Sequence, residues 1–149
     1  GRVQRRVVKV ALDTNVLVSA FATRGLCADL FNLVLAEHEL ILGVTVLAES
    51  QRVLRQKMRI PMETTRELIA FLRREAMVVG KTPALPVAIR DASDGRVLAE
   101  AVAGGAEVLV TGDQDLLSIA ADSPIEILSP RGLWLRLTAE AGRVRRTRT

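Results

Sequence analysis

Short apolar runs alternate along the chain with longer stretches in which apolar residues recur every three or four positions. Runs of the first kind are typical of buried strands, and stretches of the second kind are typical of amphipathic helices. The runs predict strands at 7–12, 40–44, 77–79, 107–111 and 125–128. The stretches predict helices at 26–36, about 46–58, 64–77, 93–102 and about 114–121, with Thr45, Thr64 and Ser93 as their capping residues where a cap is visible.

Regular alternation of strands and helices indicates an α/β fold of three layers, α/β/α, with a mostly parallel sheet and helices on both faces. The chain has 149 residues, of which 49% are apolar, so one domain with a substantial aliphatic core is expected. We place this domain at 7–137, after a basic N-terminal extension at 1–6. A basic tail at 138–149 follows, and we expect it to be disordered.

The formal net charge of +4 comes from the two ends of the chain. Residues 1–6 carry +3 and residues 138–149 carry another +3, which leaves −2 for the domain between them. Basic ends of this kind bind phosphates or remain solvated. The candidates for nucleic-acid binding are the tail arginines Arg143, Arg145, Arg146 and Arg148.

Composition narrows the classes of protein. A single cysteine excludes a disulfide framework and a cysteine-based zinc site. No apolar run approaches the roughly 20 residues of a membrane span, and no secretory signal is visible, so a cytoplasmic protein is expected. With no tyrosine and one tryptophan, the chain lacks the aromatic residues for a base-stacking platform.

Acidic residues follow several predicted strands. Asp13 ends the first strand, Asp113 follows the strand at 107–111, and Asp94 lies in the first turn of a helix. Glu49 lies on the helix that leaves the second strand, between apolar neighbours. Ligands of open parallel sheets bind beyond the carboxyl ends of the strands, so these carboxylates are expected on one side of the sheet.

Carboxylates gathered without cysteine or histidine are the ligands of a hard cation, Mg²⁺ or Mn²⁺. Metal-dependent hydrolysis of phosphodiester bonds is the reaction that most needs this arrangement. Each acidic residue also has an ordinary interpretation as a turn residue, a helix cap or a solvated charge. Asp91 and Asp115, close to Asp94 and Asp113 in sequence, are candidates for supporting or solvated positions.

Four segments together resemble a PIN domain over residues 7–134. They are VALDTNVL at 10–17, Glu49, RDASD at 90–94 leading into VLA at 97–99, and LVTGDQDLL at 109–117. The likeness is to the toxin branch of bacterial toxin–antitoxin systems, which is related to the VapC-type ribonucleases. That branch often has proline where this chain has Ala92 and Ser93, and an acidic residue where this chain has Gly95. These departures weaken the case for a second metal ion and leave the first unaffected.

The resemblance implies a metal-binding and catalytic quartet of Asp13, Glu49, Asp94 and Asp113, with Asp115 at an often acidic position. It implies supporting roles for Asn15, which usually holds the first aspartate in place, and for the hydroxyl of Thr111. It also implies an RNA substrate, a cognate antitoxin and a homodimer.

Two functions remain open from the sequence: a metal-dependent endoribonuclease and a catalytically inactive PIN-like module that binds RNA or protein. A response-regulator phosphoacceptor needs an aspartate after the third strand, where this chain offers Lys81 and no aspartate. A hydrolase that forms an aspartyl phosphate needs Asp-x-Asp after strand one, and here Asn15 stands at the second position. His38 is interpreted as a solvated residue at a helix end.

Overall fold

A computed structural model describes residues 6–83, 85 and 92–147 of the chain, with side chains through residue 139. Its centre is a five-stranded sheet, entirely parallel, in the order β3-β2-β1-β4-β5. The strands are β1 (Lys9–Leu12), β2 (Glu39–Gly43), β3 (Met77–Val79), β4 (Val108–Val110) and β5 (Glu126–Leu128). All five strands lie where the apolar runs predicted them, so this part of the sequence interpretation is confirmed.

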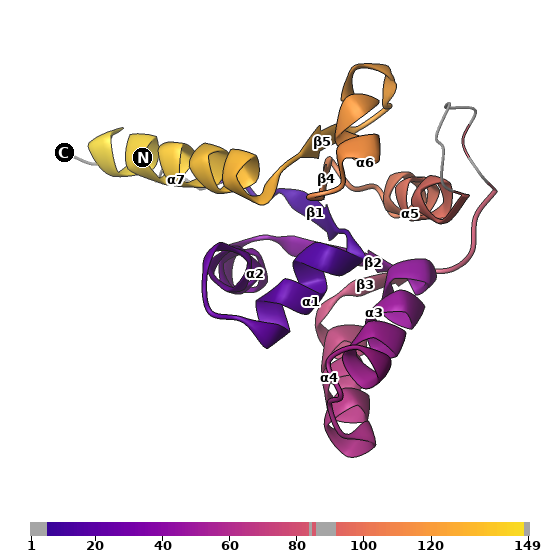
Figure 1. Cartoon of the computed structure of the whole chain (residues 1–149). Coiled ribbons are helices and arrows are strands. Elements are labelled where there is room, and N and C mark those ends of the chain that lie inside the picture. The colour runs from indigo at the N-terminus through magenta and orange to yellow at the C-terminus, as the bar shows by residue number, and fades with distance from the viewer. Residues whose placement is uncertain (1–5, 84, 86–91, 148–149) are drawn as a thin grey trace.

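The helices lie on both sides of the sheet, as the alternation predicted. They are α1 (Thr14–Ala22), α2 (Leu26–Glu37), α3 (Val44–Gln56), α4 (Met62–Glu75), α5 (Ala92–Ala103), α6 (Gln114–Ser118) and α7 (Pro130–Thr147), with a 3₁₀ turn, η1 (Ala120–Asp122). In Figure 1, α1 to α4 lie on one side of the sheet, and α5 and α6 lie on the other. The three-layer α/β/α architecture is confirmed.

Helix α1 was not predicted from the sequence. It follows β1 directly and buries Val16, Leu17 and Val18, while Phe21 makes an edge-on ring contact with Phe31 of α2 at 5.3 Å. Six of the nine residues of α1 are apolar, so no helical stripe stands out from a polar background. Within the described residues no single helix is long and apolar enough to span a membrane; α1 and α2 pass that test only as a pair, bent by 100°.

Three predicted helix caps were wrong. Helix α3 begins after Gly43 and helix α4 begins after Pro61, so neither Thr45 nor Thr64 is a capping residue. Ser93 lies inside the first turn of α5. The hydroxyls of Thr45 and Ser93 bind carboxylates on other helices instead, which is a tertiary interaction that local sequence does not reveal.

Helix α7 continues through Thr147, into the segment from residue 138 that the sequence predicted to be a disordered tail. Pro130 supplies the dihedral angle of the first helical turn. Leu133 and Leu137, four residues apart, are both buried and anchor the helix, while Trp134 is partly buried and packs against the same core. Once anchored, the helix propagates through the good helix formers that come after.

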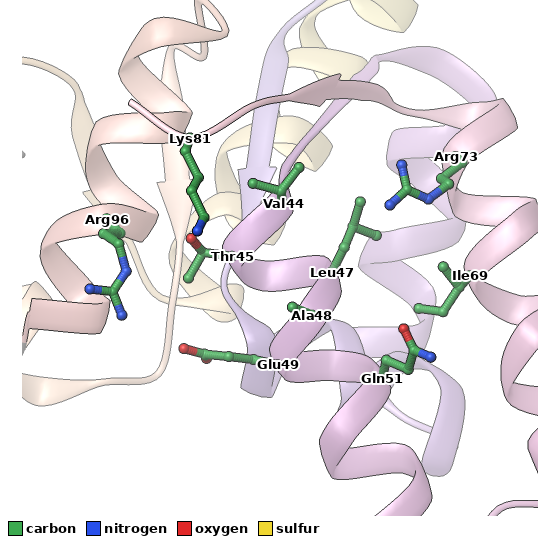
Figure 2. Close-up of a pocket in the computed structure, with 10 residues that line it drawn as sticks. All are labelled: Val44, Thr45, Leu47, Ala48, Glu49, Gln51, Ile69, Arg73, Lys81 and Arg96. Atoms are coloured by element: carbon green, nitrogen blue, oxygen red, sulfur yellow. The ribbon is translucent and has the colours of Figure 1, made fainter. Parts of the chain in front are cut away.

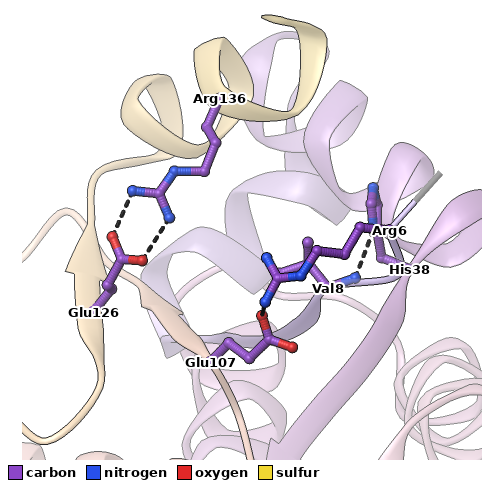
Figure 3. Close-up of polar contacts among 6 residues, drawn as sticks. All are labelled: Arg6, Val8, His38, Glu107, Glu126 and Arg136. Carbon is purple, nitrogen blue, oxygen red and sulfur yellow. Dashed lines mark hydrogen bonds and ion pairs between the residues drawn. The ribbon is translucent and has the colours of Figure 1, made fainter. Parts of the chain in front are cut away.

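The edge of the sheet at the amino ends of the strands carries its own polar contacts (Figure 3). Arg6 pairs with Glu107 at 2.7 Å, and Arg136 of α7 forms two hydrogen bonds with Glu126 of β5. The Nδ1 atom of His38 accepts the N–H of Val8 at 3.0 Å. The imidazole is therefore half-buried and bonded rather than solvated, and it lies at the edge opposite the acidic residues that come after β1 and β4.

Candidate metal centre

Two of the acidic residues follow the central pair of strands. The order of the sheet reverses between β1 and β4, which are hydrogen-bonded neighbours with Leu12 opposite Val110. Such a switch point leaves a crevice at the carboxyl ends of the two strands, because the connections leave it in opposite directions. Asp13 follows β1 at this crevice, and Asp113 follows β4.

Thr111 joins these two aspartates. Its hydroxyl donates to Oδ2 of Asp13 at 2.7 Å and accepts the backbone N–H of Asp113 at 2.9 Å. Thr111 is fully buried, so this link is held rigidly between the strands. The described hydrogen bonds of the Asp13 carboxylate come from Thr111 and Thr14, whereas Asn15 lies exposed beside the site in the first turn of α1.

Asp13 is only 5% exposed and caps the N-terminus of α1, where its Oδ1 accepts the N–H of Thr14 at 2.8 Å. Burial raises the pKa of this carboxyl group above its ordinary value. The hydrogen bonds from Thr111 and Thr14 oppose this shift, and the charges of Asp113 and Glu49 add to it. The site therefore holds a carboxylate that lacks solvent and lies near others of the same charge.

Glu49 joins the site from α3. Its Oε2 accepts the hydroxyl of Thr14 at 2.9 Å, and its Oε1 accepts the hydroxyl of Ser93 on α5. Glu49 thereby links α1, α3 and α5. Asp94, the residue after Ser93, and Glu49 both line one surface hollow. Hydroxyl donors orient a carboxylate without adding charge, so they leave its negative charge uncompensated.

Asp94, Asp113 and Asp115 form the tightest acidic group among the described residues. Each offers one carboxylate oxygen, and these three atoms all lie within 4.8 Å of one another. The carboxylate of Asp113 caps the short helix α6 by accepting the backbone N–H of Asp115 at 2.8 Å, which holds it against the first turn of that helix. Asp13 and Glu49 lie beside this triad rather than within it.

A hollow of about 320 Å³ opens over the centre and brings the four predicted residues together. Asp13, Glu49, Asp94 and Asp113 all line it. Arg52 and Lys57 also line it, and sequence analysis missed both. They lie three and eight residues after Glu49, which is the spacing of one helical face, so the signal was present in the sequence.

Some candidates cannot be placed. Asp91 and Arg148 lie outside the described residues. Arg143, Arg145 and Arg146 belong to α7, but their side chains are likewise outside the described part.

The donor set fits a divalent cation. The oxygens that converge on the hollow belong to carboxylates and to the hydroxyls that bind them, and three carboxylate oxygens lie close enough together to share one ion. Mg²⁺ and Mn²⁺ prefer such oxygen ligands and retain several waters. A divalent ion bound here would neutralise the negative charges of the crowded carboxylates.

A second buried carboxylate, that of Glu100, holds together two of the helices that carry site residues. Glu100 of α5 is 1% exposed, and it accepts the backbone N–H of Thr45 at 2.8 Å and the Thr45 hydroxyl at 2.5 Å. Gly43 makes room for it, because a Cβ at that position would collide with the carboxylate. The contact fixes the start of α3, one turn before Glu49, against α5, which carries Asp94.

Comparison with solved structures identifies the same fold. VapBC2 from Rickettsia felis bound to a DNA fragment from their promoter aligns with a TM-score of 0.57 and 17% identity, covering 82% of this chain and 98% of that one. VapBC-1 from nontypeable Haemophilus influenzae aligns with a TM-score of 0.58 and 16% identity, covering 83% of this chain and 99% of that one. PAE2754 from Pyrobaculum aerophilum aligns with a TM-score of 0.59 and 19% identity, covering 89% of this chain and 90% of that one. No curated protein matches the chain in sequence.

The family assignment comes from the sequence profile of the PIN domain, which matches residues 9–115. This match runs from β1 to Asp115 and so includes every described acidic residue of the centre. PIN domains are generally nucleases that use divalent metal ions, and the acidic triad of this chain agrees with that chemistry. The chain therefore belongs to the PIN domain family.

Proposed function

We propose that this protein is a Mg²⁺- or Mn²⁺-dependent endoribonuclease. The observation that carries the proposal is the convergence of carboxylates from four different strand-to-helix connections on one crevice of the sheet. Neutral hydroxyl groups orient the carboxylates of Asp13 and Glu49, and burial makes the charge of Asp13 costly without a cation. Such an arrangement is unfavourable for stability alone and suits metal-assisted hydrolysis.

Asp13, Glu49, Asp94 and Asp113 are proposed to hold the metal, with Asp115 as a further ligand. A bound divalent ion supplies an activated water and stabilises charge on the phosphoryl group. Thr111 positions Asp13 and Asp113, and Thr14 and Ser93 position Glu49. Arg52 and Lys57, on the rim of the hollow, are placed to attract the phosphates of the substrate.

The choice of RNA and the wider context rest on resemblance. The chain resembles VapC-type ribonucleases in its motifs, and its fold matches solved VapBC structures. We propose accordingly that it is the toxin of a type II toxin–antitoxin pair, with a cognate antitoxin protein, a homodimeric state and a cytoplasmic location. Asp91 is proposed to support the site, and the arginines at 143, 145, 146 and 148 to bind nucleic acid.

Cleavage of total RNA, mapped with Mn²⁺ and with chelator, tests this proposal. Wild type should cut RNA at internal positions only with metal. Asp13→Asn, Asp94→Asn and Asp113→Asn should each abolish cleavage while retaining the fold, and Glu49→Gln should do the same or slightly less. Glu107→Gln, at the opposite edge of the sheet, is the control and should cleave normally.

Activity retained in two of those four variants would contradict the quartet. If wild type binds no Mn²⁺ in a calorimetric titration and cuts no RNA, the chain is instead an inactive module that binds RNA or protein.

A further inference from the structure

A second and larger hollow, of about 570 Å³, lies beside the acidic centre. Its floor is apolar and comes from Val44 and Leu47 of α3 and Ile69 of α4. Figure 2 shows these side chains between Lys81 and Arg96 on one side and Arg73, on the α4 side, on the other. Its volume lies in the range of roughly 300–1,000 Å³ that small-ligand sites occupy.

The rim of this hollow is basic. Arg73 of α4, Lys81 after β3 and Arg96 of α5 line it, against one carboxylate, that of Glu49. All three cations are exposed, so their charge is available to a ligand in solution. In Figure 2, Lys81 and Arg96 stand together across from Arg73. An apolar floor beneath several cations suits a ligand that carries both an unsaturated ring and a phosphate.

The hollow adjoins the acidic centre. Glu49 lines both spaces. Arg96 follows Asp94 by two residues on the same helix turn, so a cation of the hollow and a carboxylate of the centre lie close together on α5. A strand whose phosphate sits at the acidic centre would therefore place its neighbouring nucleotide over the hollow.

We infer that this hollow binds the nucleotide next to the scissile phosphate of the RNA strand. Its base packs on Val44, Leu47 and Ile69; Arg96 and Lys81 hold the phosphate on one side of this nucleotide, and Arg73 holds the phosphate on the other side. The inference rests on the proposed function, since it takes RNA as the substrate. It assigns substrate binding to residues outside the acidic centre.

Binding of fluorescein-labelled oligouridylate, measured by anisotropy in chelator, tests the inference without requiring cleavage. Arg73→Gln, Lys81→Gln and Arg96→Gln should each weaken binding by roughly three- to tenfold, the scale of one charged contact. Each should also reduce the slope of log affinity against log salt by about 0.7. The matched control is Arg74→Gln, because Arg74 is an exposed neighbour of Arg73 on α4 that does not line the hollow.

In the cleavage assay the same variants should raise KM and leave kcat and the affinity for Mn²⁺ unchanged, because they remove binding and not chemistry. If the three variants bind RNA as tightly as Arg74→Gln does, the inference is overturned, even where wild type cleaves RNA. If wild type does not cleave but its binding depends on these three residues, the hollow stands as an RNA site and the proposed nuclease activity fails.

Discussion

Glu100 of α5 caps helix α3, because its buried carboxylate binds both the N–H and the hydroxyl of Thr45. A capping side chain ordinarily comes from the residue before the helix, but that residue is Gly43, which has none. Glu100 takes this role from 55 residues away. The two helices that carry Glu49 and Asp94 are thus joined at one buried point.

Glu100→Ala should lower the free energy of unfolding by about 2–4 kcal/mol, since it removes two hydrogen bonds to a charge and leaves the N–H of Thr45 unsatisfied. Glu100→Gln should cost about 1 kcal/mol, because the amide oxygen still accepts a bond. Urea denaturation measures both. Glu63→Gln, an exposed residue in the first turn of α4, is the control. A loss below about 0.5 kcal/mol for Glu100→Ala would contradict the capping role.

Asp13→Asn should stabilise the metal-free protein. The folded pKa of Asp13 is raised, so the ionised form at neutral pH opposes folding, and wild type should gain stability as pH falls toward 3.8. In chelator at pH 7 the variant should melt about 2–4 °C higher, the shift that about 1 kcal/mol produces in a domain of this size.

With Mn²⁺ at a hundredfold excess over Kd, wild type should gain about 2.7 kcal/mol and Asp13→Asn much less. A thermal-shift series with and without Mn²⁺ measures both effects, and Asp29→Asn, at the start of α2, should respond to metal as wild type does. A variant that melts lower than wild type in chelator would mean that Asp13 serves α1 as a cap more than it serves a metal.

Asp115→Asn should weaken Mn²⁺ binding by about tenfold or more, comparably to Asp94→Asn, because the oxygens of both lie within 4.8 Å of each other and of Asp113. Isothermal titration calorimetry provides the measurement. Asp122→Asn, an exposed aspartate in η1, is the control and should bind as wild type does. Unchanged affinity in Asp115→Asn would restrict the metal site to the quartet.

Replacing Arg143, Arg145, Arg146 and Arg148 together by glutamine should weaken binding to RNA and reduce its salt dependence, by about 0.7 in slope for each arginine that contacts phosphate. The rate on a short saturating substrate should stay the same. Salt-dependent anisotropy and single-substrate kinetics separate the two effects. A collapse of the saturated rate would make the tail part of the reaction site.

Glu126→Gln should destabilise the protein by no more than about 1 kcal/mol at pH 7, because its pair with Arg136 is exposed. The hydrogen bonds from Arg136 lower the folded pKa of Glu126 below 4.5. The pair therefore stabilises above that pH, and its contribution disappears as pH falls through the folded pKa. Urea denaturation at pH 7 and near pH 3 should show a difference between wild type and variant only at pH 7.

The strands were predictable because each is a short apolar run in a parallel sheet that helices cover on both faces, as in the stretch from Val10 to Leu12. Helix α7 was missed because Leu133 and Leu137 are its two buried residues among the described side chains, and much of the rest of its sequence is polar. The caps at Thr45 and Ser93 were mistaken because their hydroxyls serve Glu100 and Glu49. Tertiary contacts there override a local preference.

The acidic centre was predictable in outline, since the carboxyl ends of parallel strands lie at one edge and bring the residues after them together there. How the acidic residues are grouped within the centre was not predictable. The grouping of Asp94 with Asp113 and Asp115 depends on the turn into α6, and the basic rim formed by Arg52 and Lys57 depends on the rotation of α3 about its axis. The grouping is set by packing, for which one sequence carries no direct signal, whereas the spacing of Arg52 and Lys57 from Glu49 already indicated a shared helical face.

The central position of β1 has a consequence for the order in which the protein is made. Asp13 and Glu49 are synthesised early, but β4, which pairs with β1 and precedes Thr111 and Asp113, emerges almost 100 residues behind. A nascent chain that ends before β4 cannot assemble the acidic centre, since Asp113, Asp115 and the Thr111 link are absent. The late insertion of β4 therefore delays assembly of the acidic centre until nearly the whole domain has left the ribosome.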